Sequence, residues 1–164
     1  MGGALRRVLT GPSLFIEFLQ MKEYSEPRMH TAEHLLNQAM VRLFGCARAF
    51  SSHIERKKSK CDYRFPRDLT AEERAALEAA VNAAARAGLP VTEHFVSREE
   101  AARTLDLGRL PEGAGERLRV IRIGDYDACP CIGEHVASTS EIGVFRIIST
   151  GFADGVLRVR FKLD

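Results

Sequence analysis

Two histidines that lie four positions apart, His30 and His34, are the residues whose types and spacing most directly indicate chemistry in this chain. On a helix, positions i and i+4 lie one above the other, so both imidazoles would point the same way. Near the other end of the chain, Cys131 and His135 offer a thiolate and another imidazole. Because Zn²⁺ takes nitrogen and sulfur ligands in tetrahedral geometry, these side chains predict a zinc site that joins two distant segments.

The ligand set of this predicted site stays open in two respects. Cys129 could replace Cys131 as the sulfur ligand, and His135 could lie behind the ligands instead of binding the ion. Four protein ligands would make a closed, structural site, whereas a catalytic zinc keeps one position for water or substrate. The simplest competing interpretation, surface histidines and a buried thiol, explains each residue but not their joint spacing.

The first segment also matches H-x-x-E-H, the signature of inverted zinc proteases, in which Glu33 would activate a water molecule. Such a short match occurs easily by chance. It also leaves Cys131 and His135 without a role, so a protease is the weaker hypothesis.

A helix over residues 28–44 must position the two histidines. Apolar residues recur in this range at helical spacing, Pro27 suits the first turn, and Gly45 suits the end. Both histidines therefore fall in the first two turns of a helix whose later turns belong to the core.

The second half of the predicted site falls in a turn-rich, irregular segment over residues 124–135. It follows a predicted strand over residues 118–123, which is rich in branched apolar residues. This strand would present the segment to the helix that carries the histidines.

The rest of the chain alternates between strands and helices. Capping boxes at Thr70 and Ser97 predict helices that end near residues 87 and 105. A charged turn over residues 55–59 and a surface loop over residues 107–115 separate other elements. Further strands are expected over residues 47–54, 60–65, 91–96, 141–149 and 155–163. This order predicts a single α+β domain, with helices packed on a mainly antiparallel sheet.

Length and composition favour an ordinary globular protein. The chain has 164 residues, 45% hydrophobic and 28% charged, which suits one domain with a core and argues against a disordered or membrane protein. Pro12 and Glu17 interrupt the apolar stretch that an export signal needs, so a cytoplasmic location is expected. In that compartment Cys46 and Cys61 are expected to be free and without a chemical role.

Three short motifs carry a resemblance to a known family. Residues 30–36 read HTAEHLL, residues 131–135 read CIGEH, and residues 139–143 read TSEIG. Together they resemble the editing domain shared by class II alanyl- and threonyl-tRNA synthetases, and in particular the AlaX-type free-standing alanyl-tRNA editing proteins. The resemblance covers residues 26–164 and leaves residues 1–25 as an N-terminal extension.

The resemblance implies a trans-editing hydrolase that uses Zn²⁺ to deacylate alanine tRNA mischarged with serine or glycine. An aminoacyl ester is activated, so zinc and polar neighbours suffice to cleave it without a serine or cysteine nucleophile. A site built to bond a substrate hydroxyl can reject the analogue that lacks it, which would let the enzyme spare alanine.

The same resemblance implies roles for individual residues. Its metal ligands would be His30, His34, Cys131 and His135. Its catalytic residues would be Thr31 and His135, with the Thr31 hydroxyl helping to recognise serine. Substrate binding would involve Thr31, Gly133, Thr139 and Glu141.

Two groups of basic residues are candidates for contacts with tRNA phosphates. In the last strand, basic residues alternate with apolar ones, which predicts one buried face and one cationic face. The candidates are Arg56, Lys57, Lys58 and Lys60 around the charged turn and Arg158, Arg160 and Lys162 in the last strand. The alternative is that these are solvated faces without a ligand. His53 is expected to be a structural histidine outside the zinc site.

A function from a different class stays open. A closed four-ligand site, with no access from Thr31 to a substrate, would favour a non-catalytic tRNA-binding or structural zinc module. The sequence carries no indication of an oligomeric state.

Overall fold

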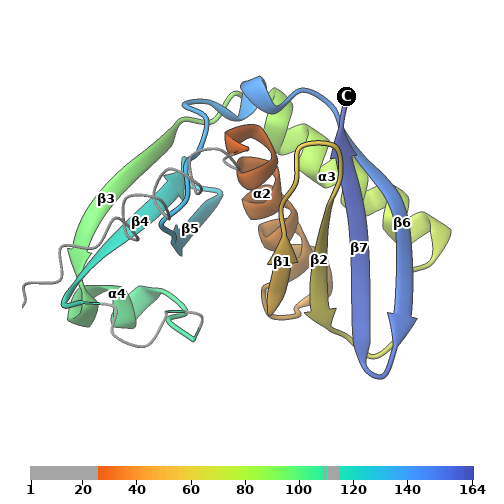
Figure 1. Cartoon of the computed structure of the whole chain (residues 1–164), viewed down its shortest axis with the longest axis horizontal. Coiled ribbons are helices and arrows are strands. Elements are labelled where there is room, and N and C mark those ends of the chain that lie inside the picture. The colour runs from red at the N-terminus through yellow and green to blue at the C-terminus, as the bar shows by residue number, and fades with distance from the viewer. Residues whose placement is uncertain (1–25, 109, 111–114) are drawn as a thin grey trace, which may run out of the picture.

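Helix α2 (Pro27–Phe44) lies between two antiparallel sheets, as Figure 1 shows. The computed structural model describes residues 26–108, 110 and 115–164, so the expected N-terminal extension, residues 1–25, lies outside the described part. One sheet contains, in spatial order, β1 (Ser51–His53), β2 (Ser59–Arg64), β7 (Val156–Leu163) and β6 (Phe145–Ala153). The other contains β3 (Val91–Ser97), β4 (Arg117–Ile123) and β5 (Asp127–Pro130). The remaining described elements are α3 (Ala71–Arg86), α4 (Arg98–Thr104) and the short 3₁₀ helix η1 (Thr139–Ile142). The expected α+β architecture is therefore confirmed.

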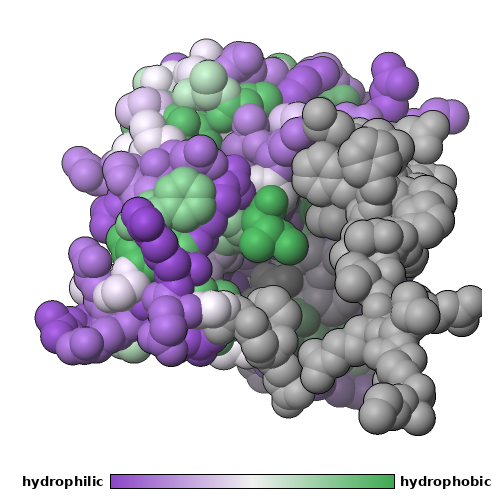
Figure 2. Space-filling model, turned by 60° about the vertical axis from the view of Figure 1, so that its left-hand side comes forward, coloured by the Kyte–Doolittle hydropathy of each residue, from purple (hydrophilic) through white to green (hydrophobic). Residues whose placement is uncertain are grey.

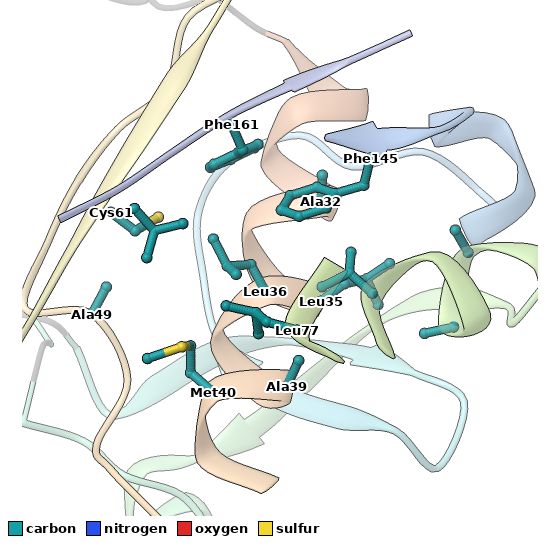
Figure 3. Packing of buried hydrophobic residues seen from close by; sticks show 14 of the residues in the cluster. Ala32, Leu35, Leu36, Ala39, Met40, Ala49, Cys61, Leu77, Phe145 and Phe161 are labelled. Carbon is teal, nitrogen blue, oxygen red and sulfur yellow. The ribbon is translucent and has the colours of Figure 1, made fainter. Parts of the chain in front are cut away.

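The core lies where α2 meets α3 and the four-stranded sheet (Figure 3). Leu35 and Leu36 of α2, Leu77 of α3 and Phe161 of β7 are fully buried. Phe161 also packs against Phe145, with the ring centroids 5.1 Å apart. Burying a side chain of this kind stabilises the fold by about 1.5–3 kcal/mol, so this core holds α2 firmly in place.

The ends of α2 and α3 follow the predicted signals, whereas at α4 the Ser97 hydroxyl accepts the Glu100 N–H without the reciprocal half of the predicted capping box. Pro27 occupies the first turn of α2, and Gly45 ends the helix in the left-handed conformation, with φ of 66°. Glycine suits that position because it has no Cβ to clash there. The Thr70 hydroxyl caps α3 by accepting the Glu73 N–H, and the Glu73 carboxylate in turn accepts the Thr70 N–H. The α3 capping box is thus confirmed.

Two parts of the predicted strand pattern are wrong. The range 141–149 begins with η1 instead of a strand, because Ser138 and Glu141 form a capping box around it. The following hairpin turns at Asp154 and Gly155 rather than over residues 150–154, since both residues take positive φ angles, 51° and 75°. Such a tight turn allows pairing to continue to Ala153.

The segment over residues 124–135 is less irregular than expected, because it contains strand β5. This strand pairs with β4, and Cys129 lies opposite Ile121. The strand within residues 47–54 is correspondingly short and covers only Ser51–His53.

Two further expectations, about the cysteines and about membrane spans, can be compared with the structure. All four cysteines of the chain are free. No helix in the described ranges is both long and apolar enough to cross a membrane.

Candidate metal centre

The fold brings the four predicted metal ligands together. His30 and His34 project from the first turns of α2, and Cys131 and His135 come from the segment that follows β5. One ligand atom from each residue lies within 4.8 Å of all the others. The Cys131 Sγ atom lies 3.3 Å from His30 Nε2 and 3.5 Å from His135 Nε2. This cluster is suited to hold a metal ion.

The Nδ1 atom of each histidine in the cluster faces an oxygen of the protein. For His30 it is the Glu134 carbonyl at 3.2 Å, and for His34 it is the Asp127 carboxylate at 3.4 Å. These oxygens only accept, so Nδ1 carries a proton, and Nε2 is the nitrogen that can bind an ion once any proton on it is displaced. Metal-binding histidines are commonly oriented in this way.

The third histidine is oriented by a hydroxyl. The Thr31 Oγ1 atom lies 3.0 Å from His135 Nδ1 and also accepts the Val136 N–H at 3.3 Å. Thr31 itself is fully buried, so its hydroxyl lies behind His135. The donor set therefore comprises imidazole nitrogens and one sulfur, which suits Zn²⁺.

The electrostatics of the cluster favour a thiolate at Cys131. Burial by itself raises the pKa of this thiol, but hydrogen bonds from His135, His30 and His34 outweigh burial and lower the pKa to about 3. Thiolate is the form that binds metals. Burial, assisted by the neighbouring histidines, lowers the pKa of His135 to about 4 and keeps that ring neutral.

The pKa of His34 is raised, unlike that of His135, because His34 faces a carboxylate. Burial lowers its pKa, but the neighbouring Asp127 carboxylate, the Cys131 sulfur and the nearby Glu33 raise it to about 9. Arg48 holds Asp127 from the other side at 2.6 Å. Burial raises the pKa of Asp127, yet His34 and Arg48 together bring it below its usual value. A bound cation would take the place of the His34 proton in this network.

Cys129 has other surroundings than Cys131. Its thiol donates to the Pro130 carbonyl at 3.5 Å, and burial raises its pKa to about 11. Cys129 is absent from the cluster of candidate ligands found in the described residues. The geometry therefore favours Cys131 as the sulfur ligand.

Gly133 allows the ligand segment to lie directly against α2. A Cβ atom at this position would overlap the His30 ring. Arg119 fixes the segment from outside, because its Nη1 donates to the carbonyls of Cys131 at 2.9 Å and Gly133 at 2.8 Å. Glu93 holds Arg119 at 2.6 Å.

Two residues of the third motif hold the backbone together. The buried Thr139 hydroxyl donates to the Ala84 carbonyl at 2.9 Å and accepts the Leu89 N–H at 2.8 Å. Glu141 accepts the Ser138 N–H at 2.8 Å. The Thr139 contacts connect η1 with the end of α3, the Glu141 contact closes η1 itself, and neither residue lines the cavity beside the cluster.

A cavity of about 610 Å³ opens beside the cluster. The metal-site residues His30, His34, Cys131 and Gly133 form part of its wall, Glu33 lies next to them, and Arg117 and Arg119 contribute cations. Ile132 also lines the cavity, although 78% of it is exposed. Figure 2 turns the β3–β4 side of the molecule forward and shows a mainly hydrophilic surface with separate hydrophobic patches.

The predicted cationic face is partly neutralised. Arg158 makes two bonds of 2.7 Å to Asp62, and Lys162 lies 2.7 Å from Asp164. At the charged turn, Arg56 lies 4.0 Å from Glu26. The remaining candidates for phosphate contacts are Lys57, Lys58, Lys60 and Arg160, of which Lys60 and Arg160 are cross-strand neighbours. His53 pairs with Glu55 and lies outside the metal cluster.

Several residues that support the site carry no signal in the sequence. Asp127, Arg48 and Arg119 are ordinary charged residues outside the motifs, and nothing in their spacing connects them to the histidines. Their roles depend on contacts between separate segments of the chain, 79 positions apart for Arg48 and Asp127 and 12 to 26 positions apart for Arg119 and its partners.

Comparisons with known proteins relate this chain to one domain family and to alanine–tRNA ligases. Residues 118–160 match the family described as "Threonyl and Alanyl tRNA synthetase second additional domain". Over 134 residues, 80% of the chain, the sequence is 37% identical to an alanine–tRNA ligase of Idiomarina loihiensis and 36% identical to one of Coxiella burnetii. It is 36% identical over 140 residues to an alanine–tRNA ligase of Neisseria meningitidis. The matched part is 16% or 15% of these ligases, so the chain spans about a sixth of their length.

Proposed function

Because this chain carries a second additional domain of the threonyl and alanyl tRNA synthetase type, we propose that it hydrolyses the ester of mischarged alanine tRNA. The amino acid removed would be serine or glycine. The observation that supports this most directly is the cluster of three imidazoles and one thiolate beside a cavity of about 610 Å³. The proposed place of action is the cytoplasm.

In this proposal His30, His34, Cys131 and His135 hold Zn²⁺. When bound, the ion supplies Lewis-acid chemistry, which polarises a carbonyl or lowers the pKa of a water molecule. The surrounding residues supply orientation. The Glu134 carbonyl, the Asp127 carboxylate and the Thr31 hydroxyl each face one imidazole Nδ1.

We assign Thr31 a positioning role. Its buried hydroxyl lies against His135 and Val136, so it acts on the substrate through the imidazole. Gly133 serves by leaving room for His30, and its backbone forms part of the cavity wall. The 3′ end of the tRNA would enter this cavity, and the basic residues Lys57, Lys58, Lys60 and Arg160 would contact phosphates elsewhere on the tRNA.

A deacylation assay tests the proposal. Zinc-loaded protein is incubated with alanine tRNA charged with serine, glycine or alanine, with and without a chelator. We expect hydrolysis of the seryl or glycyl ester, sparing of the alanyl ester, loss of activity with chelator and recovery with Zn²⁺. Failure of the zinc-loaded protein to cleave any of these esters would refute the proposal.

One observation favours a second candidate, a structural zinc module that binds tRNA without cleaving it. Four protein donors within 4.8 Å of one another can close the coordination of a zinc ion. The two functions differ in one measurement. A structural module would lose thermal stability on chelation and bind tRNA, yet it would leave every ester intact.

A further inference from the structure

Glu33 places a carboxylate in the cavity wall next to the metal cluster. The residue is only 5% exposed, and its Oε2 atom lies 3.8 Å from Nε2 of His34, the nitrogen that faces the cluster. Among the described residues that line this cavity, Glu33 is the one acid. A carboxylate at such a place has a strong preference for cationic or hydrogen-bond-donating groups of a ligand.

The orientation of this carboxylate is fixed by a chain of hydrogen bonds. The Ala49 N–H donates to Asn37 Oδ1 at 2.8 Å, so the Asn37 amide must turn its NH₂ group to Glu33 Oε1, which lies 2.7 Å away. The Ser52 hydroxyl donates to the same Oε1 atom at 2.9 Å. Both donors hold one oxygen, and the other oxygen is the one near His34.

The proposed substrate carries a cation at a matching distance from its reacting atom. In an aminoacyl ester the α-nitrogen is separated from the ester carbonyl carbon by one carbon, a distance of about 2.5 Å from standard bond lengths. A group that binds the ammonium must therefore lie within a few ångströms of the metal site. The Glu33 carboxylate meets this condition through its 3.8 Å approach to His34 Nε2.

The other charges of the cavity fit the rest of the substrate. Arg48 is engaged with Asp127, and Arg119 with Glu93 and two carbonyls. Arg117 is exposed, and its guanidinium lies 5.9 Å from the centre of the Phe95 ring. The cavity thus has an anion beside the cluster and a cation on its wall, which matches an ammonium at one end and a phosphate at the other.

We propose that Glu33 binds the α-ammonium group of the aminoacyl ester and so selects substrates with a free amine. This inference rests on the proposed function. The site takes primary ammonium groups and discriminates against N-acylated aminoacyl or peptidyl esters. The loss of one charge-assisted hydrogen bond is expected to weaken binding by a factor on the order of 10 to 100.

A binding experiment tests the ammonium site without requiring hydrolysis. The ligands are 3′-serylamino-adenosine, a stable amide analogue of the ester end, and the same compound with an acetylated amine. Calorimetry is performed on the zinc-loaded full chain, on Glu33→Gln and on the control Glu72→Gln, whose side chain is exposed at the start of α3. Zinc content and thermal unfolding are recorded for each protein.

We expect the wild type and Glu72→Gln to bind the free amine about 10 to 100 times more tightly than the acetylated analogue. Glu33→Gln should retain zinc and bind both analogues equally. Equal binding of the two analogues by the wild type would overturn the proposal, whatever the stability of the variant. Undiminished discrimination by a folded Glu33→Gln would overturn it as well.

Kinetics separate this proposal from the proposed function and from a role of Glu33 in activating water. With seryl and N-acetylseryl alanine tRNA, Glu33→Gln should raise KM for the seryl ester alone. A fall of kcat by the same factor for both esters would refute ammonium binding and indicate a role in the chemical step. Analogue discrimination by a wild type that cleaves neither ester would refute the hydrolase and support the ammonium site.

Discussion

The Oγ1 atom of Thr31 lies 3.0 Å from Nδ1 of His135, although 104 positions separate the two residues in the chain. The residue beside one candidate ligand therefore orients another ligand from the opposite segment. The contact couples the packing of α2 to the geometry of the ligand segment.

Thr31→Val tests this contact, because it keeps the shape of the side chain and removes the hydroxyl. His135 loses the group facing its Nδ1, and the Val136 N–H loses its acceptor. We expect zinc affinity to fall by about 10- to 100-fold, the usual effect of removing such a partner. Competition with a chromophoric chelator measures it, with the exposed Thr92→Val as a control. Unchanged affinity would show that His135 needs no such support.

Cys131→Ser and Cys129→Ser form a matched pair. Cys131 lies in the cluster with its pKa lowered to about 3, whereas burial raises the pKa of Cys129 to about 11. We expect Cys131→Ser to lose stoichiometric zinc and Cys129→Ser to retain it, as measured by elemental analysis of purified protein. The reverse result would exchange the two cysteines in the ligand set.

Gly133→Ala is expected to disrupt the site through sterics alone. The added Cβ would overlap the His30 ring and force either the ring or the ligand segment to move. Zinc affinity should fall by more than about tenfold. Gly151→Ala is the control, since a Cβ there meets nothing within 4 Å. Equal zinc affinity of the two variants would contradict the close approach of the ligand segment to α2.

Zinc affinity is expected to depend on pH through His34. Its pKa is raised to about 9, so its proton stabilises the metal-free fold at low pH, and this contribution is lost as pH rises through that value. Zinc displaces that proton, while Cys131 and His135 have already lost theirs above about pH 4. The apparent Kd for zinc should therefore rise about tenfold for each pH unit as the pH falls from about 8 to about 5. A flat profile by competition titration would contradict a proton on His34.

Thr139→Val separates a structural role from substrate binding. The Thr139 hydroxyl bonds to Ala84 and Leu89, so its loss leaves buried backbone groups without partners. We expect the free energy of unfolding to fall by about 1–3 kcal/mol in chemical denaturation, with zinc affinity unchanged. Unchanged stability together with reduced hydrolysis would instead support contact with the substrate.

Local signals account for what could be predicted of the fold. The turn around Pro27, the αL position of Gly45 and the capping box at Thr70 each depend on residues a few positions apart. The predicted start of the strand that forms β6 is wrong, because Ser138 and Glu141 form a capping box in a range that is also apolar enough for a strand. The apolar residues favour a strand there, whereas the capping hydrogen bonds stabilise the 3₁₀ helix that forms.

By itself, the sequence determined which side chains offer metal-binding atoms, because imidazole and thiolate chemistry and helical spacing are local properties. Only the tertiary structure decided which groups orient and charge those atoms. Asp127 lies 3.4 Å from His34, Thr31 lies 3.0 Å from His135, and Arg48 holds Asp127 at 2.6 Å, all through contacts between segments distant in the chain. Such contacts depend on the pairing of distant segments in space, and no local pattern of residues encodes it.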